Sequence, residues 1–218
     1  GVEDFEIVRE DTLREPAFTD PGSNGLATFD CVIANPPFSL QEWGHSEWES
    51  DTWGRNLYGI PPKKNGDFAW LEHMIASMRK TTGRIAVVQP NGVLFRGGAE
   101  GKIRRRLLEE DLIETVISLA DNLFYGTSIA ASILILRDKK SSEKQNKVLM
   151  VKADELFRRG RAQNFFDPEH IEQVAAWVSD YTTIEYKTKV VDIKEIENEE
   201  WSLNPSLYIQ SEAEHESV

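Results

Sequence analysis

Two kinds of hydrophobic pattern alternate along the chain. Short runs rich in apolar and β-branched residues predict strands, and longer stretches with apolar residues three or four positions apart predict amphipathic helices. We expect strands at 5–9, 29–34, 83–90, 112–119, 128–136 and 148–151, and helices at 67–80, 99–110 and 168–180. This alternation is typical of a layered α/β fold.

One long segment, 41–66, follows neither pattern. It contains Trp43, Trp48 and Trp53 together with several glycines and prolines. Long ordered loops of this kind are usually functional. Because three tryptophans are costly to expose, the segment forms either a small hydrophobic core or a lid facing DNA or a partner.

Composition narrows the class of protein. The chain has 218 residues, of which 40% are hydrophobic and 28% charged, a balance that indicates a folded domain and excludes disordered and membrane-protein classes. No apolar run approaches the roughly 20 residues of a membrane span, and no signal-peptide pattern is visible. We expect a cytoplasmic protein with no membrane contact.

Cysteine and histidine usage argues against metal and disulfide chemistry. The single cysteine, Cys31, excludes an internal disulfide and a cysteine-based zinc cage. It lies in the predicted strand 29–34, where we expect it to be buried and inert. The four histidines are scattered without metal-ligand spacing, so no metal ligand is assigned, and Glu72 and His73 are expected at the surface of the helix 67–80.

The net charge of −12 is concentrated near the carboxyl terminus. Residues 192–218 carry eight acids against Lys194, which leaves only −5 on the rest of the chain. An acidic chain binds nucleic acid poorly by itself, so contact with DNA would require a basic partner or a local basic patch. The sequence offers two candidate patches. The first is either a solvated helix face or a phosphate-binding surface and comprises Arg96, Lys102, Arg104, Arg105 and Arg106. The second is expected to be a solvated turn and comprises Arg158, Arg159 and Arg161.

A predicted strand runs directly into Asn35-Pro36-Pro37-Phe38. Two consecutive prolines fix two φ angles and remove two backbone donors. The result is a rigid turn that presents acceptors only, namely the Asn35 side-chain oxygen and the Pro36 carbonyl. Because ligands of open α/β sheets bind outside the carboxyl ends of the strands, this turn is a candidate site.

Rigid acceptors beside an aromatic ring suit methyl transfer to an amino nitrogen of a base. Two acceptors that bind the two amino hydrogens favour a pyramidal nitrogen with a free lone pair, while Phe38 stacks on a base flipped out of the duplex. Positioning would do most of the catalytic work, without a metal. The alternative is a plain turn, which is how we interpret the shorter Asn204-Pro205 sequence.

The tetrapeptide and its surroundings resemble the modification (methyltransferase) subunit of type I restriction-modification systems, in the N6-adenine DNA methyltransferase family. The resemblance extends from about residue 3 to 209. Its motifs are Asp11-Thr12-Leu13, Asn35 to Phe38, Gly59 to Lys63, Asp67 to Trp70, Gly83 to Glu100, Asn122 to Thr127 and Ser202 to Pro205.

The resemblance implies a role for each matched residue. Asn35 and Pro36 would hold the target amino group, Pro37 would stiffen the turn, and Phe38 would stack on the adenine. Asp11 would contact the adenine of S-adenosyl-L-methionine, with Leu13 lining the same pocket and Asn35 also near the cofactor. The stretch from Asn122 to Ser128 would form a turn near the target base.

The resemblance also implies a fold: a partial Rossmann-like, S-adenosyl-L-methionine-dependent methyltransferase sheet with helices on both faces and a helical, acidic carboxyl-terminal extension. We expect residues 1–150 to be the carboxyl-terminal part of the catalytic domain, 151–210 the extension and 211–218 a disordered tail. The first two strands of such a sheet and the glycine-rich cofactor loop are not found before Asp11.

Two consequences follow from these missing elements. Apolar strand edges should be open. The 218 residues alone should bind S-adenosyl-L-methionine weakly or not at all, and micromolar affinity in a calorimetric titration would contradict this expectation.

Three functions remain open. The first is adenine-N6 DNA methylation with DNA, a specificity subunit and a restriction (nuclease-translocase) subunit as partners. The second is methylation of protein glutamine or RNA by the same chemistry. The third is a non-catalytic remnant that docks on a specificity subunit.

Overall fold

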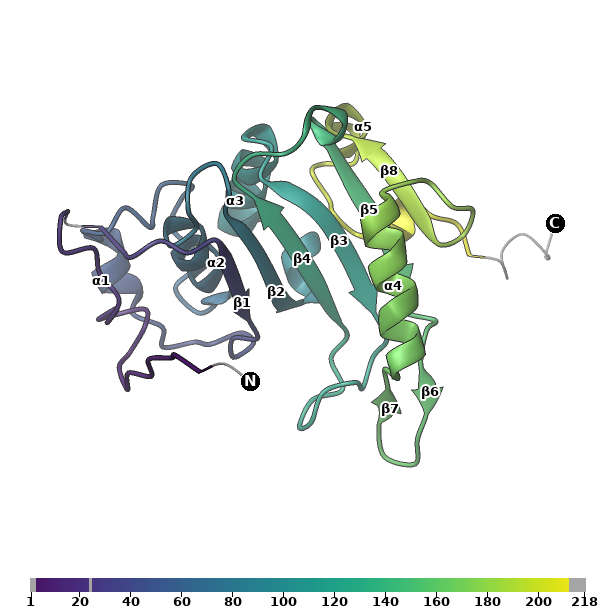
Figure 1. Ribbon diagram of the computed structural model, residues 1–218, viewed down its shortest axis with the longest axis horizontal. Coiled ribbons are helices and arrows are strands. Elements are labelled where there is room, and N and C mark those ends of the chain that lie inside the picture. The colour runs from purple at the N-terminus through teal and green to yellow at the C-terminus, as the bar shows by residue number, and fades with distance from the viewer. Residues whose placement is uncertain (1–2, 24, 212–218) are drawn as a thin grey trace.

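A mixed six-stranded sheet forms the centre of the molecule (Figure 1). The computed structural model describes residues 3–23 and 25–211. The strand order is β1-β2-β4-β3-β5-β8, in which β1 with β2 and β3 with β5 are parallel pairs and the other neighbours are antiparallel. The strands are β1 (Cys31–Ala34), β2 (Arg84–Pro90), β3 (Ile113–Leu119), β4 (Ala131–Arg137), β5 (Lys147–Ala153) and β8 (Thr188–Asp192), with a separate hairpin of β6 (Arg158–Arg159) and β7 (Asn164–Phe165).

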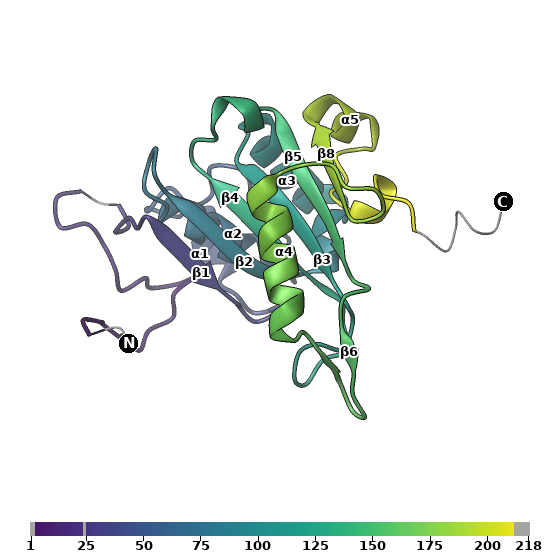
Figure 2. The same ribbon diagram turned by 45° about the vertical axis from the view of Figure 1, so that its right-hand side comes forward.

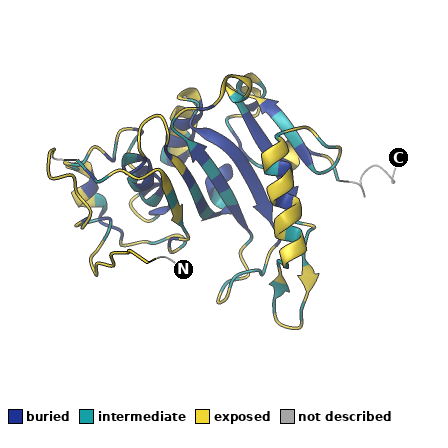
Figure 3. Ribbon diagram, in the orientation of Figure 1, coloured by how far each residue is buried: buried dark blue, intermediate teal, exposed yellow. Residues whose placement is uncertain are grey.

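Helices cover both faces of the sheet, as expected (Figures 1 and 2). One face packs against α2 (Asp67–Ala76), α3 (Gly98–Glu109) and α5 (Ile193–Asn198) in the larger apolar core. The other face packs against α4 (Pro168–Asp180), where Val174 and Trp177 cover β3 and β5. The outer surface of α4 faces solvent (Figure 3). The remaining helical turns are α1 (His45–Glu49), η1 (Asn91–Leu94), η2 (Ser142–Lys144) and η3 (Pro205–Leu207).

Most predicted elements are confirmed to within a few residues, but the strand at 5–9 is wrong. These residues have no regular secondary structure, and Phe5 and Ile7 are exposed. A strand needs a hydrogen-bonding neighbour, and no strand in the described part of the chain lies beside them. The pattern also missed β8, which pairs with β5 at the far edge of the sheet.

The expectation that Cys31 is buried is also wrong, because β1 is an edge strand. In the described residues β1 pairs with β2 alone, and Cys31 and Ile33 point to the sheet face beyond the cover of α4. Cys31 is exposed and Ile33 is 78% exposed. The open apolar edge expected from the sequence is therefore present at β1.

The tryptophan-rich segment forms a small hydrophobic core. Trp43 and Trp48 are each 1% exposed and pack with Leu13 and Ala69 of α2. The Arg55 guanidinium lies 4.2 Å from the Trp48 ring centroid and is paired with Asp51 at 2.7 Å. These contacts favour the small core over the lid for this part of the loop.

The first basic cluster is divided between the interior and the surface of the protein. Arg104 is buried and donates to the carbonyl oxygens of Val93, Arg96 and Trp201. Arg106 donates to the Tyr58 carbonyl at 2.9 Å. Lys102, Arg105 and Arg106 are exposed on α3, as a solvated helix face requires, whereas the donors of Arg104 are used within the fold. No helix in the described ranges is long and apolar enough to cross a membrane.

Candidate active site at the carboxyl edge of the sheet

Strand directions bring three separate loops to one edge of the sheet. β1 and β2 are parallel. β3 runs in the same direction as β2, because β2 and β3 are both antiparallel to β4. β5 is parallel to β3 and also ends at this edge. The turn 35–39 after β1, the loop 120–130 between β3 and β4, and the hairpin after β5 therefore all lie at this edge.

Two of these loops line a cavity of about 430 Å³. The Phe38 and Phe124 rings meet edge to face at its wall, with centroids 6.2 Å apart and an interplanar angle of 74°. The loop 120–130 is held at its end, where the Asn91 amide donates to the Ala130 carbonyl at 3.1 Å. The cavity is lined by Asn35, Pro36, Pro37, Phe38, Phe124, Tyr125, Thr127 and Ile129.

The motif presents free acceptors to this cavity. Asn35 is exposed, and within the described structure its side chain and the Pro36 carbonyl make no hydrogen bond. Pro36 is buried and fixes the base of the turn, whereas Phe38 is half-buried against Phe124. The acceptors are thus available to a ligand while the backbone that carries them is anchored.

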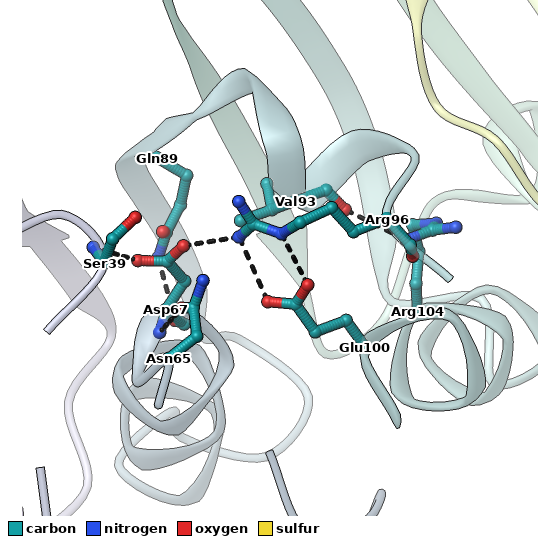
Figure 4. Close-up of polar contacts among 8 residues, drawn as sticks. All are labelled: Ser39, Asn65, Asp67, Gln89, Val93, Arg96, Glu100 and Arg104. Atoms are coloured by element: carbon teal, nitrogen blue, oxygen red, sulfur yellow. Dashed lines mark hydrogen bonds and ion pairs between the residues drawn. The ribbon is translucent and has the colours of Figure 1, made fainter. Parts of the chain in front are cut away.

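The turn is fastened to the start of α2 by Asp67 (Figure 4). Ser39 has the left-handed φ of 52°, which is uncommon for a residue with a side chain. Its amide donates to Asp67 Oδ1 at 2.7 Å, and the neighbouring Leu40 carbonyl accepts from the Gly66 amide at 2.9 Å. Asp67 is 1% exposed, so this carboxylate holds the strained turn from inside the protein.

Arg96 balances the buried charge of Asp67 (Figure 4). Its guanidinium donates to Asp67 Oδ2 at 2.5 Å and to both carboxylate oxygens of Glu100, at 2.5 and 3.0 Å. Burial lowers the pKa of Arg96, but Glu100 and Asp67 outweigh that effect and hold the pKa above its usual value. The site turn, α2 and α3 are joined through this one ion cluster.

The residues expected to contact the cofactor lie in the preceding segment. The Asp11 side chain accepts from the Leu13 and Arg14 amides and from Arg14 Nη1 at 2.8 Å. Partial burial raises the pKa of Asp11, but these donors outweigh it and the pKa is lowered. Leu13 is buried in the tryptophan core. Asp11 keeps an exposed carboxylate that fits a hydrogen-bonded ligand, whereas the Leu13 side chain is already occupied by packing.

Comparison with known proteins decides the family. The chain matches the N-6 DNA Methylase family over residues 1–217. The chain belongs to this family. It is 32% identical, over 99% of its own length, to the type I restriction enzyme MjaVII methylase subunit of Methanocaldococcus jannaschii, and 31% identical, over 94%, to the HindI methylase subunit of Haemophilus influenzae. It covers 37% and 46% of those two proteins.

Solved structures agree with this assignment to the N-6 DNA methylases. The type I restriction-modification methyltransferase subunit from Streptococcus thermophilus superposes with a TM-score of 0.82 and 33% identity, covering 92% of this chain and 41% of that one. A putative class I S-adenosylmethionine-dependent methyltransferase from Listeria monocytogenes shares the fold, with a TM-score of 0.50 and 18% identity. The α/β methyltransferase-like fold expected from the sequence is confirmed.

Sequence reasoning missed several residues of the candidate site. The stretch 122–128 was expected near the target base, and the structure brings Phe124 from it against Phe38. Asp67 and Arg96 stand inside the matched motifs, but nothing in their spacing shows that they meet at 2.5 Å. Asp11 and Leu13 do not line the cavity that Asn35 and Phe38 share.

The expectation that Glu72 lies at the surface is wrong. It is 1% exposed on α2, and although it lies near the amides of Tyr58 and Gly59, neither carboxyl oxygen has a hydrogen bond of normal geometry. Burial raises the pKa of Glu72 to about 9, so the group is protonated at neutral pH. Its neighbour His73 is half-buried, and burial together with Arg55 lowers the pKa of His73 to about 4.

The pKa shifts of Glu72 and His73 predict opposite effects of pH on stability. For Glu72 the native pKa of about 9 exceeds the ordinary 4.5, so the unfolded chain releases a proton that the folded chain keeps, and stability falls as pH rises through this window. For His73 stability rises with pH between about 4 and 6.5. Glu72 therefore dominates this pair above pH 6.5.

Replacing Glu72 with glutamine is expected to remove the alkaline part of this dependence. Between pH 6.5 and 8.5 the unfolding free energy of the unmodified chain should fall, relative to Glu72→Gln, by up to about 3 kcal/mol. Urea unfolding of both proteins at the two pH values measures the difference. An equal change in both proteins would show that Glu72 is ionised in the native state.

Proposed function

We propose that this chain carries the target-base site of an adenine-N6 DNA methyltransferase that works as the modification subunit of a type I restriction-modification system. The observation that carries the proposal is the cavity in which the free acceptors of Asn35 and Pro36 lie beside Phe38 and Phe124. The relatives named above, methylase subunits of type I restriction enzymes, support the same reaction.

The chemistry of the lining favours positioning over proton abstraction. Tyr125 is the one titratable side chain that lines the cavity, and it is 89% exposed. The Asn35 side-chain oxygen and the Pro36 carbonyl would accept the two hydrogens of the adenine amino group. Held in this way, the nitrogen loses conjugation with the ring and gains a directed lone pair. Preorganised acceptors of this kind act without reorganising during the reaction.

The aromatic residues would hold the base in place. An adenine in a duplex cannot present its amino group to a protein acceptor, so the base must leave the stack first. Phe38 would stack on the flipped base, and the edge-to-face contact of Phe124 with Phe38 limits how the Phe38 ring can turn. Stacking of this kind contributes about 1–3 kcal/mol per base.

S-adenosyl-L-methionine would supply the methyl group. Of the residues in this chain, Asp11 offers a carboxylate for hydrogen bonds to the cofactor and Asn35 lies at the site where the methyl group must arrive. Leu13 would act indirectly, because it supports the Asp11 turn from within the tryptophan core.

Assembly with other subunits would fit the acidic charge of the chain. A subunit with a net charge of −12 would depend on a specificity subunit for DNA sequence recognition and would work beside a restriction subunit in the cytoplasm. Within it, residues 1–150 would be part of the catalytic domain and 151–210 an extension. The chain spans 37% to 46% of its named relatives, so these activities belong to the whole subunit.

The test is methyl transfer by the full-length subunit expressed with its specificity subunit. Labelled S-adenosyl-L-methionine and duplex DNA should give labelled N6-methyladenine, identified after nuclease digestion. Labelled protein glutamine or RNA with unlabelled DNA would support the second function instead. Assembly with the specificity subunit without any transfer would support the non-catalytic remnant.

A further inference from the structure

The β6–β7 hairpin stands beside the proposed base site. β5 ends at the carboxyl edge of the sheet, and the chain continues directly into this hairpin. In two views the hairpin projects past the sheet at the same end as the loop between β3 and β4 (Figures 1 and 2). It therefore shares an edge with the loop that contributes Phe124.

Hydrogen bonds fix the hairpin to that loop. The Asn164 amide donates to the Asn122 carbonyl at 2.9 Å, and Asn122 Nδ2 donates to the Ala162 carbonyl at 3.1 Å. Asn164 Nδ2 also donates to the Asp121 carbonyl at 3.0 Å. Asn122 precedes Phe124 by two residues, so the hairpin is held at a defined place next to the cavity.

The hairpin turn itself is tight. The Gly160 amide donates to the Gln163 carbonyl at 3.0 Å. A Cβ atom at Gly160 would lie 2.4 Å from both the Gln163 carbonyl oxygen and the Phe165 ring, so a side chain does not fit there. Arg158 is fixed by Asp167, with Nε to Oδ2 at 2.7 Å, and lies over the Phe165 ring. The turn is thus preorganised rather than loose.

Two arginines of this turn have unused charges. Arg159 and Arg161 are exposed, and neither guanidinium makes a hydrogen bond or ion pair with any residue that the structure describes. Their situation differs from that of Arg96 and Arg104, whose donors are used within the fold. Two unpaired guanidinium groups on a rigid support stand out in a chain of net charge −12.

We infer that Arg159 and Arg161 bind phosphates of the DNA strand that flank the flipped adenine. The inference rests on the proposed function, since it takes the cavity of Phe38 and Phe124 as the place of the base. Guanidinium groups suit phosphate oxygens in charge and geometry. A flipped nucleotide needs its neighbouring backbone held while the base occupies the cavity, and two arginines on a fixed hairpin next to the loop that contributes Phe124 meet that need.

The test is the salt dependence of DNA binding by the full-length subunit in complex with its specificity subunit. Each phosphate contact contributes about 0.9 to the slope of log K against log salt concentration. The variants Arg159→Gln and Arg161→Gln should each reduce that slope by about 0.9, and the double variant by about 1.8. The slope is measured on a target duplex, because the proposed phosphates flank the adenine that is flipped there.

A matched control removes a positive charge elsewhere. Lys139 is exposed just after β4, at the opposite edge of the sheet, and Lys139→Gln should leave the slope unchanged. Fluorescence anisotropy of a labelled duplex between 50 and 300 mM KCl, roughly the range in which such contacts weaken, provides the affinities. Thermal unfolding of each variant verifies that the fold is intact.

The outcomes separate this inference from the proposed function. An unchanged slope in the double variant overturns the inference, and so does loss of the specificity subunit from that variant in size-exclusion chromatography, which would make the hairpin a protein contact. Methylation by the unmodified complex is measured in parallel. Its absence contradicts the proposed function alone, while a reduced slope still supports the phosphate contacts.

Discussion

Methyl transfer to DNA is expected to fall by about 10²–10³-fold when Asn35 is replaced with alanine, because a preorganised acceptor for the reacting amino group is lost. Stability should change by no more than about 0.5 kcal/mol, since the Asn35 side chain is exposed and has no hydrogen bond within the described structure. The measurement is the single-turnover rate of the full-length subunit with its specificity subunit, together with the unfolding free energy.

Two further variants sharpen this prediction. Asn35→Asp keeps an oxygen acceptor and should retain part of the rate that alanine loses. Asn204→Ala is the matched control, because Asn204 also precedes a proline but only caps η3 through the Ser206 amide. Its expected cost is about 1 kcal/mol of stability with no loss of rate. A normal rate for Asn35→Ala would contradict the proposed role of the motif.

Replacing Asp67 with alanine is expected to reduce both stability and methyl transfer. The change removes the acceptor of the strained Ser39 amide and one of the two carboxylates that hold Arg96. Breaking a buried ion pair costs about 3–5 kcal/mol when it leaves a buried charge unpaired, and because Arg96 is 32% exposed and keeps Glu100 we expect a smaller cost. The turn that carries Phe38 then loses its anchor, so the rate should fall as well.

The conservative variant separates positioning from stability. Asp67→Asn keeps an oxygen for the Ser39 amide but loses the charge that faces Arg96, so it should lose stability while retaining more of the rate than alanine. Glu109→Ala serves as the control, because its ion pair with Arg105 is exposed and worth at most about 1 kcal/mol. Urea unfolding and single-turnover rates provide the two readouts. Equal rates for alanine and asparagine at Asp67 would contradict the proposed anchoring of the turn.

Local hydrophobic patterns and backbone restrictions predicted much of the fold. The apolar runs of β2, β3 and β4 and the spacing of Phe68, Leu71 and Ile75 on α2 predicted elements that the structure confirms. Asn35-Pro36-Pro37-Phe38 was readable for the same reason, since prolines restrict the backbone whatever the rest of the chain does. The strand predicted at 5–9 is not formed, because a strand also requires a hydrogen-bonding neighbour, which the hydrophobic pattern does not show.

The candidate site depended on contacts between distant segments. Phe124 meets Phe38 because β1 and β3 end at one edge of the sheet, and Asp67 meets Ser39 because α2 begins beside the turn. The arginines differ for the same reason. Arg104 donates to carbonyl oxygens inside the fold, whereas the guanidinium groups of Arg159 and Arg161 have no partner among the described residues, beside the proposed base site.

The sequence by itself determined the class of fold and the acceptor turn, because these follow from periodicity and backbone restriction, and its motifs carried the resemblance to the family. The tertiary structure alone decided which residues share the cavity, which charges are neutralised and which stay available. Burial and pairing of a side chain depend on partners far away in the chain, as Glu72 shows: its position on α2 was readable, but its burial and its pKa of about 9 were not.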